Sequence, residues 1–265
     1  MRIGILGCAG RMGRTNIRQV LAAGLTLSGG TERPGSEALG QDLGVLAGVE
    51  PVGLVATDDA RGVIAGSSAV IEFSTPEASL AHARLCAELG CGHVIGTTGL
   101  GADGEAELRA LAQRIPIMWA PNMSVGVNLL LGVVRQVAAT LDEDYDIEIV
   151  EMHHRHKVDA PSGTALALGR AAAAGRGVGP DDAFVRVRDG VTGPRRRGSI
   201  GFATLRGGDV VGDHTVMFAG EGERFEITHK ASDRVIYARG AVRAARWLSG
   251  RTPGLYGMAD VLGLR

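Results

Sequence analysis

The sequence predicts an α/β protein in two parts, a first half built on a parallel sheet and a second, mixed α+β part with one open sheet. The first observation is a short apolar run at residues 2–6, followed by a glycine-rich turn and a helical pattern at residues 14–23. Strand, glycine-rich turn and helix, in that order, form the Rossmann-type unit that binds dinucleotides. The second observation is the strict apolar–polar alternation of residues 146–152, after which strand patterns dominate.

The overall composition is that of an ordinary folded protein. The chain has 265 residues, of which 45% are hydrophobic and 22% charged, and its net charge is −1. A net charge so close to zero argues against nucleic-acid or membrane-surface partners. Three cysteines without metal-type spacing fit a reducing compartment. No apolar run approaches the ~20 residues that span a membrane. We therefore expect a cytoplasmic protein.

The glycines of the first turn have distinct expected roles. Gly7 makes the tight turn, Gly10 lets the backbone approach a pyrophosphate, and Gly13 allows the helix to pack closely. Arg11 and Met12 then lie at the edge of the site. The spacing is G-x-x-G-x-x-G rather than the commoner G-x-G-x-x-G, so a plain βα turn is the alternative interpretation.

A second strand, at residues 25–30, ends in Thr31, Glu32 and Arg33. An acidic residue about 20 positions after the glycine turn is expected to bind the ribose hydroxyls, and a neighbouring arginine favours a 2′-phosphate. Glu32 beside Arg33 therefore predicts tolerance of both NADH and NADPH, with a solvated charged loop as the alternative. The segment at residues 34–53 is interpreted as a surface loop.

Further strand and helix patterns alternate up to residue 141. Strands are expected at residues 69–73, 93–95 and 115–119, and helices at residues 77–89, from 100 to 114, and 128–141. Turns at the carboxyl ends of parallel strands lie where cofactors bind. We therefore expect Gly96, Thr97 and Thr98 to contact the nicotinamide half, unless they form a plain βα loop. The segment 120–128 is a candidate hinge that also touches the cofactor.

The most informative stretch is residues 151–164, EMHHRHKVDAPSGT. It places three histidines, an arginine and a lysine within five positions, directly before a turn that opens an Ala/Leu-rich helix. A helix N-terminus attracts anions, and imidazole and ammonium groups donate protons. The combination suits a substrate that carries carboxylates and must also be protonated. The alternatives are a solvated strand end and a metal site, which Arg155 and Lys157 disfavour because they repel cations.

Strand patterns continue in the last third of the chain, and a sheet of this kind can carry an oligomer interface. Strands are expected at residues 184–188, 199–206, 213–219 and 223–229, and a helix at 241–248. We interpret His82, His93, His214 and His229 as structural, and Arg195–Arg197 as a solvated loop.

Five segments, in one order along nearly the whole chain, carry a resemblance to a known family. They are GCAGRMG, GTTG, APNMSVGVN, HHRHKVDAPSGTA and HKASDR. Together they resemble the 4-hydroxy-tetrahydrodipicolinate (dihydrodipicolinate) reductases of lysine and diaminopimelate biosynthesis. The resemblance implies a dinucleotide-binding domain at residues 1–124 with 235–265, a substrate-binding and oligomerisation domain at residues 125–234, and a homotetramer. It also implies NADH- or NADPH-dependent reduction of a cyclic imine dicarboxylate with loss of water, without a metal.

The resemblance also implies residue roles. His153 is similar to the catalytic proton donor and acceptor, Lys157 to the proton-donating lysine, and His154 to a substrate-carboxylate contact. Gly163 and Thr164 match the substrate-binding turn. The positions that match cofactor contacts are Gly7, Cys8, Ala9, Gly10, Arg11, Met12, Glu32, Arg33, Gly96, Thr97, Thr98, Ala120, Pro121, Asn122, Met123, Arg234 and Tyr237. The family often has Phe at the position of Tyr237. Cys8 occupies a variable position and suggests an oxidation-sensitive cofactor site.

Two other functions share parts of this pattern. An aspartate or homoserine dehydrogenase shares the first half but does not need HHRHK followed by PSGT. A dinucleotide-sensing regulator would need an effector surface or a DNA-binding segment, and the sequence shows neither a basic face nor an additional domain.

Overall fold

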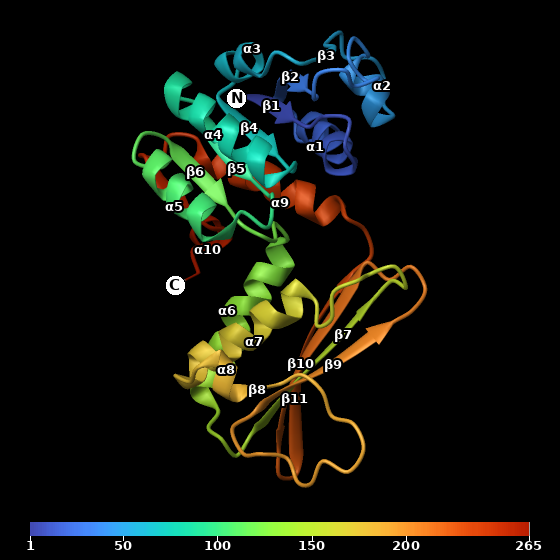
Figure 1. The fold of residues 1–265 in the computed structure, drawn as a ribbon, viewed down its shortest axis with the longest axis vertical. Coiled ribbons are helices and arrows are strands. Elements are labelled where there is room, and N and C mark those ends of the chain that lie inside the picture. The colour runs from blue at the N-terminus through green and yellow to red at the C-terminus, as the bar shows by residue number, and fades with distance from the viewer. Residues whose placement is uncertain (265) are drawn as a thin grey trace. The chain divides into compact units, whose positions relative to one another are not determined.

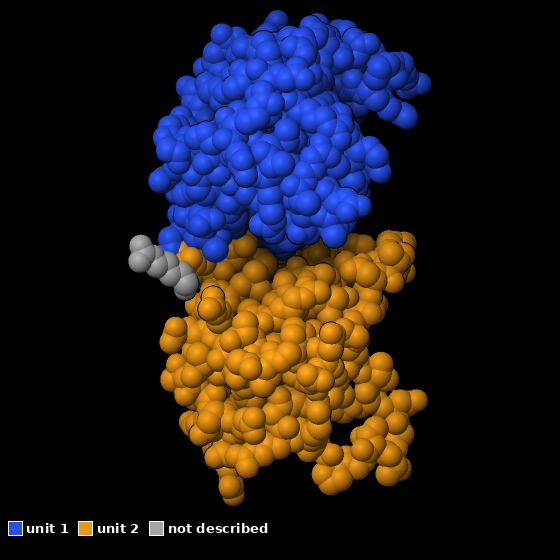
Figure 2. All heavy atoms as spheres, turned by 60° about the vertical axis from the view of Figure 1, so that its left-hand side comes forward, with its two compact units in different colours: residues 1–125, 235–263 blue, residues 126–234, 264–265 orange. Residues whose placement is uncertain are grey.

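The computed structural model describes residues 1–264. Backbone contacts divide the chain into unit 1, residues 1–125 and 235–263, and unit 2, residues 126–234 with Leu264, which Figure 2 colours separately. Arg265, which the predicted first domain includes, lies outside the described residues. The functional roles of the two units stay predictions at this point.

Unit 1 contains a parallel sheet in the order β12-β6-β5-β4-β1-β2-β3 (Figure 1). Its strands are β1 (Arg2–Leu6), β2 (Thr26–Thr31), β3 (Ala56–Thr57), β4 (Ala69–Glu72), β5 (Gly92–Ile95), β6 (Pro116–Trp119) and β12 (Gly254–Tyr256). The chain runs outward from β1 in one direction and then outward from β4 in the other. This is the Rossmann strand order, and ligands of such sheets bind at the carboxyl ends of the strands, where the order reverses.

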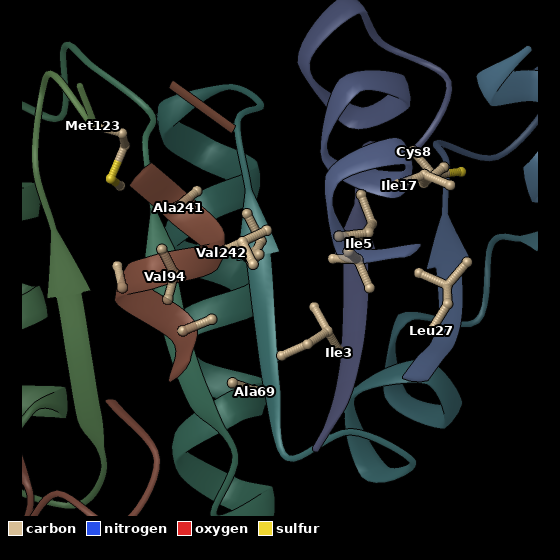
Figure 3. Packing of buried hydrophobic residues seen from close by; sticks show 14 of the residues in the cluster. Ile3, Ile5, Cys8, Ile17, Leu27, Ala69, Val94, Met123, Ala241 and Val242 are labelled. Atoms are coloured by element: carbon tan, nitrogen blue, oxygen red, sulfur yellow. The ribbon is translucent and has the colours of Figure 1, made fainter. Parts of the chain in front are cut away.

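Helices cover both faces of this sheet. They are α1 (Arg11–Ala22), α2 (Leu43–Ala47), α3 (Ala60–Ala65), α4 (Pro76–Leu89), α5 (Gly101–Leu111), α9 (Val235–Leu248) and α10 (Met258–Leu262). Neighbouring strand residues alternate between two cores. Val94 packs in the cluster with α1 and α9, where Figure 3 also shows Ile3 and Ile5, whereas Ile95 packs with α3, α4 and α5. The strands are therefore apolar on both faces, as buried parallel strands are.

Two expectations for unit 1 were partly wrong, because they missed a short helix and placed the start of another helix too late. The segment 34–53 is not all surface loop, because α2 lies within it and Leu43 is fully buried. Asp42 begins this helix by accepting hydrogen bonds from the amides of Gly44 and Val45, which is a normal N-cap. The last long helix also starts at Val235 rather than at residue 241.

Unit 2 contains a mixed sheet in the order β11-β10-β7-β9-β8, covered on one face by helices (Figure 1). The strands are β7 (Asp146–His153), β8 (Phe184–Val185), β9 (Ile200–Arg206), β10 (Gly212–Gly220) and β11 (Glu223–Ala231). The helices are α6 (Val125–Thr140), α7 (Gly163–Arg176) and α8 (Pro180–Ala183). β7 and β9 are parallel, whereas β10 runs antiparallel to β7 and β11.

The alternation along β7 sorts its side chains between the two faces of the sheet. Ile147 and Ile149 are fully buried in the core beneath α6 and α7. Glu151 and His153 continue the same face and are 1% and 8% exposed. The inner face of the sheet is therefore apolar at one end and polar at the other, and the polar end carries the histidine cluster.

The segment between β8 and β9 also differed from expectation. β8 covers two residues only, and most of the segment up to residue 197 is exposed coil. Arg195 is not solvated, however: its guanidinium lies 2.7 Å from Asp146 and 3.0 Å from Glu148 and donates to the carbonyls of Ile147 and Ser199. These long-range partners could not be inferred from the run of three arginines.

Candidate active site

The glycine-rich turn lies at the carboxyl end of β1. Gly7 has φ +74°, which favours glycine, and the amides of Gly7 and Cys8 each donate to the carbonyl of Thr31 at 2.9 Å. A Cβ on Gly13 would lie 2.0 Å from the carbonyl oxygen of Gly7. Helix α1 therefore packs directly against the turn, and both glycines have the roles that the sequence predicted for them.

The start of α1 leaves room for an anion. Gly10 is the N-cap residue, no side chain caps the helix, and a Cβ on Gly10 would meet only the carbonyl oxygen of Gly7, at 3.4 Å. Arg11 is exposed beside it. Uncapped amides at a helix N-terminus bind phosphate well. The residues present thus fit the pyrophosphate of a dinucleotide.

Glu32 lies at the carboxyl end of β2, beside this turn. Its Oε1 accepts a hydrogen bond from the amide of Ala9 at 2.8 Å, and its Oε2 accepts one from the amide of Arg33 at 3.3 Å. The carboxylate is thereby fixed at the edge of the turn, and the Arg33 side chain beside it is exposed. This is the position that a ribose-binding acid requires.

The GTTG turn follows β5 at the same edge of the sheet. The Thr97 hydroxyl is buried, accepts from the amide of Ser74 at 3.0 Å and lies 2.7 Å from the Ser79 hydroxyl. Its carbonyl accepts from the indole of Trp119 at 3.0 Å. The Thr97 side chain therefore braces neighbouring loops, whereas Thr98 is exposed. Of these two threonines, Thr98 is the one whose side chain is directed to solvent.

Glu72, at the end of β4, is a buried carboxylate that contacts side chains of neighbouring elements at this edge of the sheet. It is fully buried and lies 2.8 Å from His82 Nδ1 and 3.0 Å from His93 Nε2. Burial alone would raise its pKa, but the hydrogen bonds from the two histidines lower that pKa to about 2. The two histidines form part of this buried network, and Glu72 was not recognised from the sequence.

The segment 120–123 follows β6 and packs against α9. Ala120 and Met123 are buried, and a Cβ on Gly240 of α9 would lie 1.7 Å from the carbonyl oxygen of Met123. Tyr237 of the same helix packs on the same core. Pro121 is exposed, and Asn122 accepts a hydrogen bond from the amide of Ser124. Arg234 is exposed in unit 2.

The Cys8 thiol does not fit an oxidation-sensitive site. It is fully buried among the core residues between the sheet and α1. Burial and, secondarily, the Glu32 carboxylate raise its pKa to about 12. Because the thiolate is the reactive form, the suggested oxidation sensitivity is wrong. Only the backbone of Cys8 remains a candidate cofactor contact.

In unit 2, the histidine cluster begins at the end of β7. His153 Nδ1 lies 2.5 Å from Glu151 Oε2, so the ring is held by a carboxylate on the same strand. Burial lowers the pKa of His153, and Lys157 and Arg206 lower it further, against the opposing effect of Glu151. The contact at Nδ1 leaves Nε2 as the ring nitrogen that can exchange a proton with a ligand.

The turn into α7 is tied to the same carboxylate. The amide of Ser162 donates to Glu151 Oε1 at 3.0 Å, and the Ser162 hydroxyl accepts from the amide of Ala165 as the N-cap of α7. The hydroxyl also lies 3.1 Å from His214 Nε2. Gly163 is exposed and Thr164 partly exposed at the first turn. The predicted anion-binding helix start is therefore adjacent to the predicted proton donor.

Lys157 and His154 occupy the loop between β7 and α7. Lys157 Nζ lies 2.7 Å from Asp159 Oδ1, and this ion pair lowers the pKa of Asp159. The backbone amide of His154 donates to the carbonyl of Val210 at 2.7 Å. Its Nδ1 is buried, and no hydrogen-bond partner for it occurs within residues 1–264. Arg155 and His156 are exposed.

Gly212, on β10, leaves the space that the His153 ring occupies. A Cβ there would lie 2.9 Å from His153 Nε2 and 3.3 Å from Cδ2. We expect Gly212→Ala to displace the ring and to lower kcat about 10²-fold, because small misplacements of reacting groups have effects of that size. Steady-state kinetics measures it. Gly207→Ala is the control, because its Cβ would meet only the flexible end of Met152. Equal activity of both variants would contradict a role for Nε2.

Among residues 1–264, no group of three His, Cys, Asp or Glu side chains is arranged to hold a metal ion. No helix in the described part of the chain is long and apolar enough to cross a membrane.

Comparison with known families decides between the dehydrogenases that share such a sheet. Residues 1–123 match the model of "Dihydrodipicolinate reductase, N-terminus", and residues 126–262 match that of "Dihydrodipicolinate reductase, C-terminus". The chain belongs to the dihydrodipicolinate reductase family. It is accordingly an NAD(P)H-dependent oxidoreductase.

Relatives of the family match along nearly their full length. The 4-hydroxy-tetrahydrodipicolinate reductase of Parvibaculum lavamentivorans is 58% identical over all of this chain and 98% of the relative. That of Afipia carboxidovorans is 56% identical over all of this chain and 97% of the relative.

Solved structures share the fold at lower identity. The dipicolinate-bound dihydrodipicolinate reductase of Paenisporosarcina sp. TG-14 has a TM-score of 0.78 at 22% identity and covers 98% of both chains. An amine dehydrogenase from Mycobacterium smegmatis has a TM-score of 0.60 at 15% identity, covering 96% of this chain and 94% of its own. The fold alone therefore does not specify the substrate, whereas the family does.

Four residues around the histidine cluster were not identified as site residues from the sequence: Glu151, Asp159, Arg206 and His214. Glu151 carried a usable signal, because a carboxylate stands where the alternation of β7 requires an inward side chain. Arg206 and His214 carried none, because they are 55 and 52 residues distant from the partners they contact.

Proposed function

We propose that this chain catalyses the NAD(P)H-dependent reduction of 4-hydroxy-tetrahydrodipicolinate to tetrahydrodipicolinate, with loss of water, in lysine and diaminopimelate biosynthesis. The observation that supports this most is the polar end of β7, where His153, held by the Glu151 carboxylate, adjoins the start of α7 and the loop that carries Lys157. A proton donor beside an anion-binding helix start suits a cyclic imine that carries two carboxylates.

NAD(P)H supplies the hydride when bound. Loss of the 4-hydroxyl group as water leaves a conjugated imine, along which negative charge develops on hydride addition and must be met by a proton. Lys157 and His153 are the proposed donors, with His153 acting through Nε2. Asp159 holds the Lys157 ammonium in the free protein. A substrate carboxylate has the same chemistry as the Asp159 carboxylate and can take its place beside the ammonium.

The proposed carboxylate contacts lie on the loop and the helix start. The exposed Gly163 and partly exposed Thr164 belong to the first turn of α7, where the helix dipole favours an anion. His154, whose Nδ1 is buried without a partner in the described residues, is the further proposed contact. Arg155 and His156 are exposed and have no proposed role in binding.

Dicarboxylate binding is expected to take up a proton. Burial lowers the pKa of His153 in the free protein, so the ring loses its proton at a lower pH than usual. Two carboxylates bound nearby favour the imidazolium and raise that pKa again. Between the free and bound pKa values, binding must therefore be accompanied by protonation.

Calorimetry with dipicolinate tests this expectation and the substrate class together. Titrations of the NADH-bound protein in two buffers of different ionisation enthalpy give the number of protons taken up. We expect uptake near neutral pH that disappears in His153→Gln. The absence of dipicolinate binding to the NADH-bound wild type would contradict the proposed substrate class.

The proposed cofactor contacts lie along the carboxyl edge of the unit 1 sheet. The glycine turn and the start of α1 fit the pyrophosphate, and Glu32 with Arg33 fits the adenosine ribose of either NADH or NADPH. Gly96, Thr97 and Thr98, together with the segment 120–123, are proposed for the nicotinamide half. Tyr237 and Arg234 remain proposed neighbours of the cofactor.

We further propose a homotetramer in the cytoplasm. The face of the unit 2 sheet opposite the helices carries partly exposed apolar side chains, among them Val150, Met152, Met217 and Leu205, which is 50% exposed. Exposed apolar side chains gathered on one sheet face are typical of protein–protein contacts. Sedimentation analysis measures the mass, and a monomer at micromolar concentration would contradict the assembly.

A further inference from the structure

The Glu151 side chain is the common partner of three groups on different elements. Its Oε2 lies 2.5 Å from His153 Nδ1, and its Oε1 accepts the amide of Ser162 at 3.0 Å. Arg206, at the end of β9, donates to both oxygens at 2.9 Å. The carboxylate is 1% exposed. Each of its oxygens is thus engaged by two donors in a fixed geometry.

The sheet register dictates this arrangement. His153 stands opposite Arg206 in the parallel β7–β9 pair, and Glu151 stands opposite His214 in the antiparallel β7–β10 pair. Residues two apart on a strand face the same side, so Glu151 lies beneath His153 on the inner face. Arg206 also donates to the carbonyl of Asp159, in the loop between β7 and α7. The paired side chains of Glu151 and Arg206, called the clamp below, thus also hold this loop.

We propose that Glu151, held by Arg206, is the positioning residue of the active site, fixing the His153 ring with Nε2 toward the substrate and holding it in register with the anion-binding start of α7. The inference rests on the proposed role of His153. It assigns Glu151 and Arg206 no contact with substrate. The buried Glu151 carboxylate thereby couples the proton donor on β7 to the carboxylate-binding turn, whose Ser162 lies eleven residues after Glu151.

The charges around His153 allow the effects of Glu151 and Arg206 on this ring to be distinguished. Glu151 on β7 favours the protonated ring, whereas Arg206 on β9 and Lys157 in the loop disfavour it. His214 on β10 packs edge-on at 5.1 Å, and burial, followed by the charge of His153, lowers its pKa to about 4, so it stays neutral at working pH. Removing the Glu151 charge should therefore lower the pKa of His153, and removing the Arg206 charge should raise it.

A proton-donating His153 must be protonated, so activity falls as pH rises through its pKa. In Glu151→Gln this fall should move to lower pH, by about one unit or more, and in Arg206→Met it should move to higher pH. The kcat of Glu151→Gln at its optimum should also fall, by roughly 10- to 100-fold and less than the full effect of losing a general acid. An amide can present its NH₂ to Nδ1 and so favour the wrong tautomer.

The matched control is Glu148→Gln. Glu148 lies on the same strand, on the opposite face, and is paired as well as Glu151, with Arg188 at 2.7 Å and Arg195 at 3.0 Å. Its loss removes two ion pairs but no contact with His153. A purely structural effect of an unpaired arginine should appear in this control, whereas opposite shifts in the pH profile should not.

The decisive readout is the titration of His153 itself, followed by NMR on protein labelled with nitrogen-15 histidine. The chain has seven histidines, and His153→Gln identifies the signal. We expect the midpoint to move down in Glu151→Gln, up in Arg206→Met and not at all in Glu148→Gln. Shifts in the same direction, or no shift in the folded variants, would overturn the proposal. If Glu151→Gln does not fold, Arg206→Met decides alone.

This readout needs no substrate, so it separates the inference from the proposed function. A wild type that oxidises no NADH with the predicted substrate contradicts the function, whatever the titration shows. A wild type that turns over, and depends on His153, but whose two clamp variants keep the wild-type titration and pH profile contradicts the positioning role alone.

Discussion

Lys157→Ala is expected to lower kcat by about 10²–10⁴-fold, the usual effect of losing a general acid. The substitution removes both the ammonium that pairs with Asp159 and the proposed proton donor. NADH affinity should stay within a few-fold of wild type, because the proposed cofactor contacts lie almost entirely in unit 1. Steady-state kinetics and NADH fluorescence titration measure the two quantities.

Two further lysine variants sharpen this prediction. Lys157→Arg keeps the positive charge but not a readily transferred proton, so KM should change little while kcat still falls. Lys230→Ala is the matched control, because Lys157 and Lys230 are the only lysines in the sequence and Lys230 is exposed on β11. Full activity of Lys157→Arg would show that the charge matters and that the proton comes from elsewhere. A large loss of NADH affinity in Lys157→Ala would contradict the role of the residue.

Gly13→Ala is expected to destabilise unit 1 and abolish dinucleotide binding. The new Cβ would lie 2.0 Å from the carbonyl oxygen of Gly7 and 2.7 Å from that of Cys8, and backbone atoms cannot move aside as a side chain can. Overpacking of this kind costs about 1–3 kcal/mol and at times more. Thermal unfolding, read by circular dichroism, should show a clear fall in Tm.

Gly10→Ala is the informative counterpart. Its Cβ would meet only the carbonyl oxygen of Gly7 at 3.4 Å, so the fold should tolerate it and Tm should change little. The methyl group would, however, occupy the space at the start of α1 that the pyrophosphate is proposed to use. NADH affinity should fall at least tenfold. Unchanged affinity in folded Gly10→Ala would place the phosphates elsewhere.

Much of the fold could be predicted because local patterns agree with the final packing. The strand of residues 2–6 and its glycine turn are readable since only glycine fits the positive φ at Gly7 and the contact at Gly13. The alternation of residues 146–152 predicts β7 because one of its faces is buried and the other is not. The helix start at Ser162 follows from an ordinary N-cap.

The rest depends on partners that are distant in sequence. In the sequence, Arg195 is one of three consecutive arginines that predict a solvated loop. Only the structure shows its ion pairs with Asp146 and Glu148. The packing of the Thr97 hydroxyl could not be predicted either, because it accepts from Ser74 and Ser79, which are 23 and 18 residues distant in the sequence. Sequence patterns report periodicity and local caps, whereas side-chain pairing across a sheet is fixed only by tertiary structure.

The most direct test of the central claim is a coupled assay. Dihydrodipicolinate synthase, pyruvate and aspartate semialdehyde generate the substrate, and oxidation of NADH or NADPH is followed by its absorbance. We predict oxidation that requires both the synthase and this protein, that falls at least 10²-fold in His153→Gln, and that proceeds with either cofactor. Synthase-independent oxidation, or none in a protein that binds NADH, would contradict the assigned reaction.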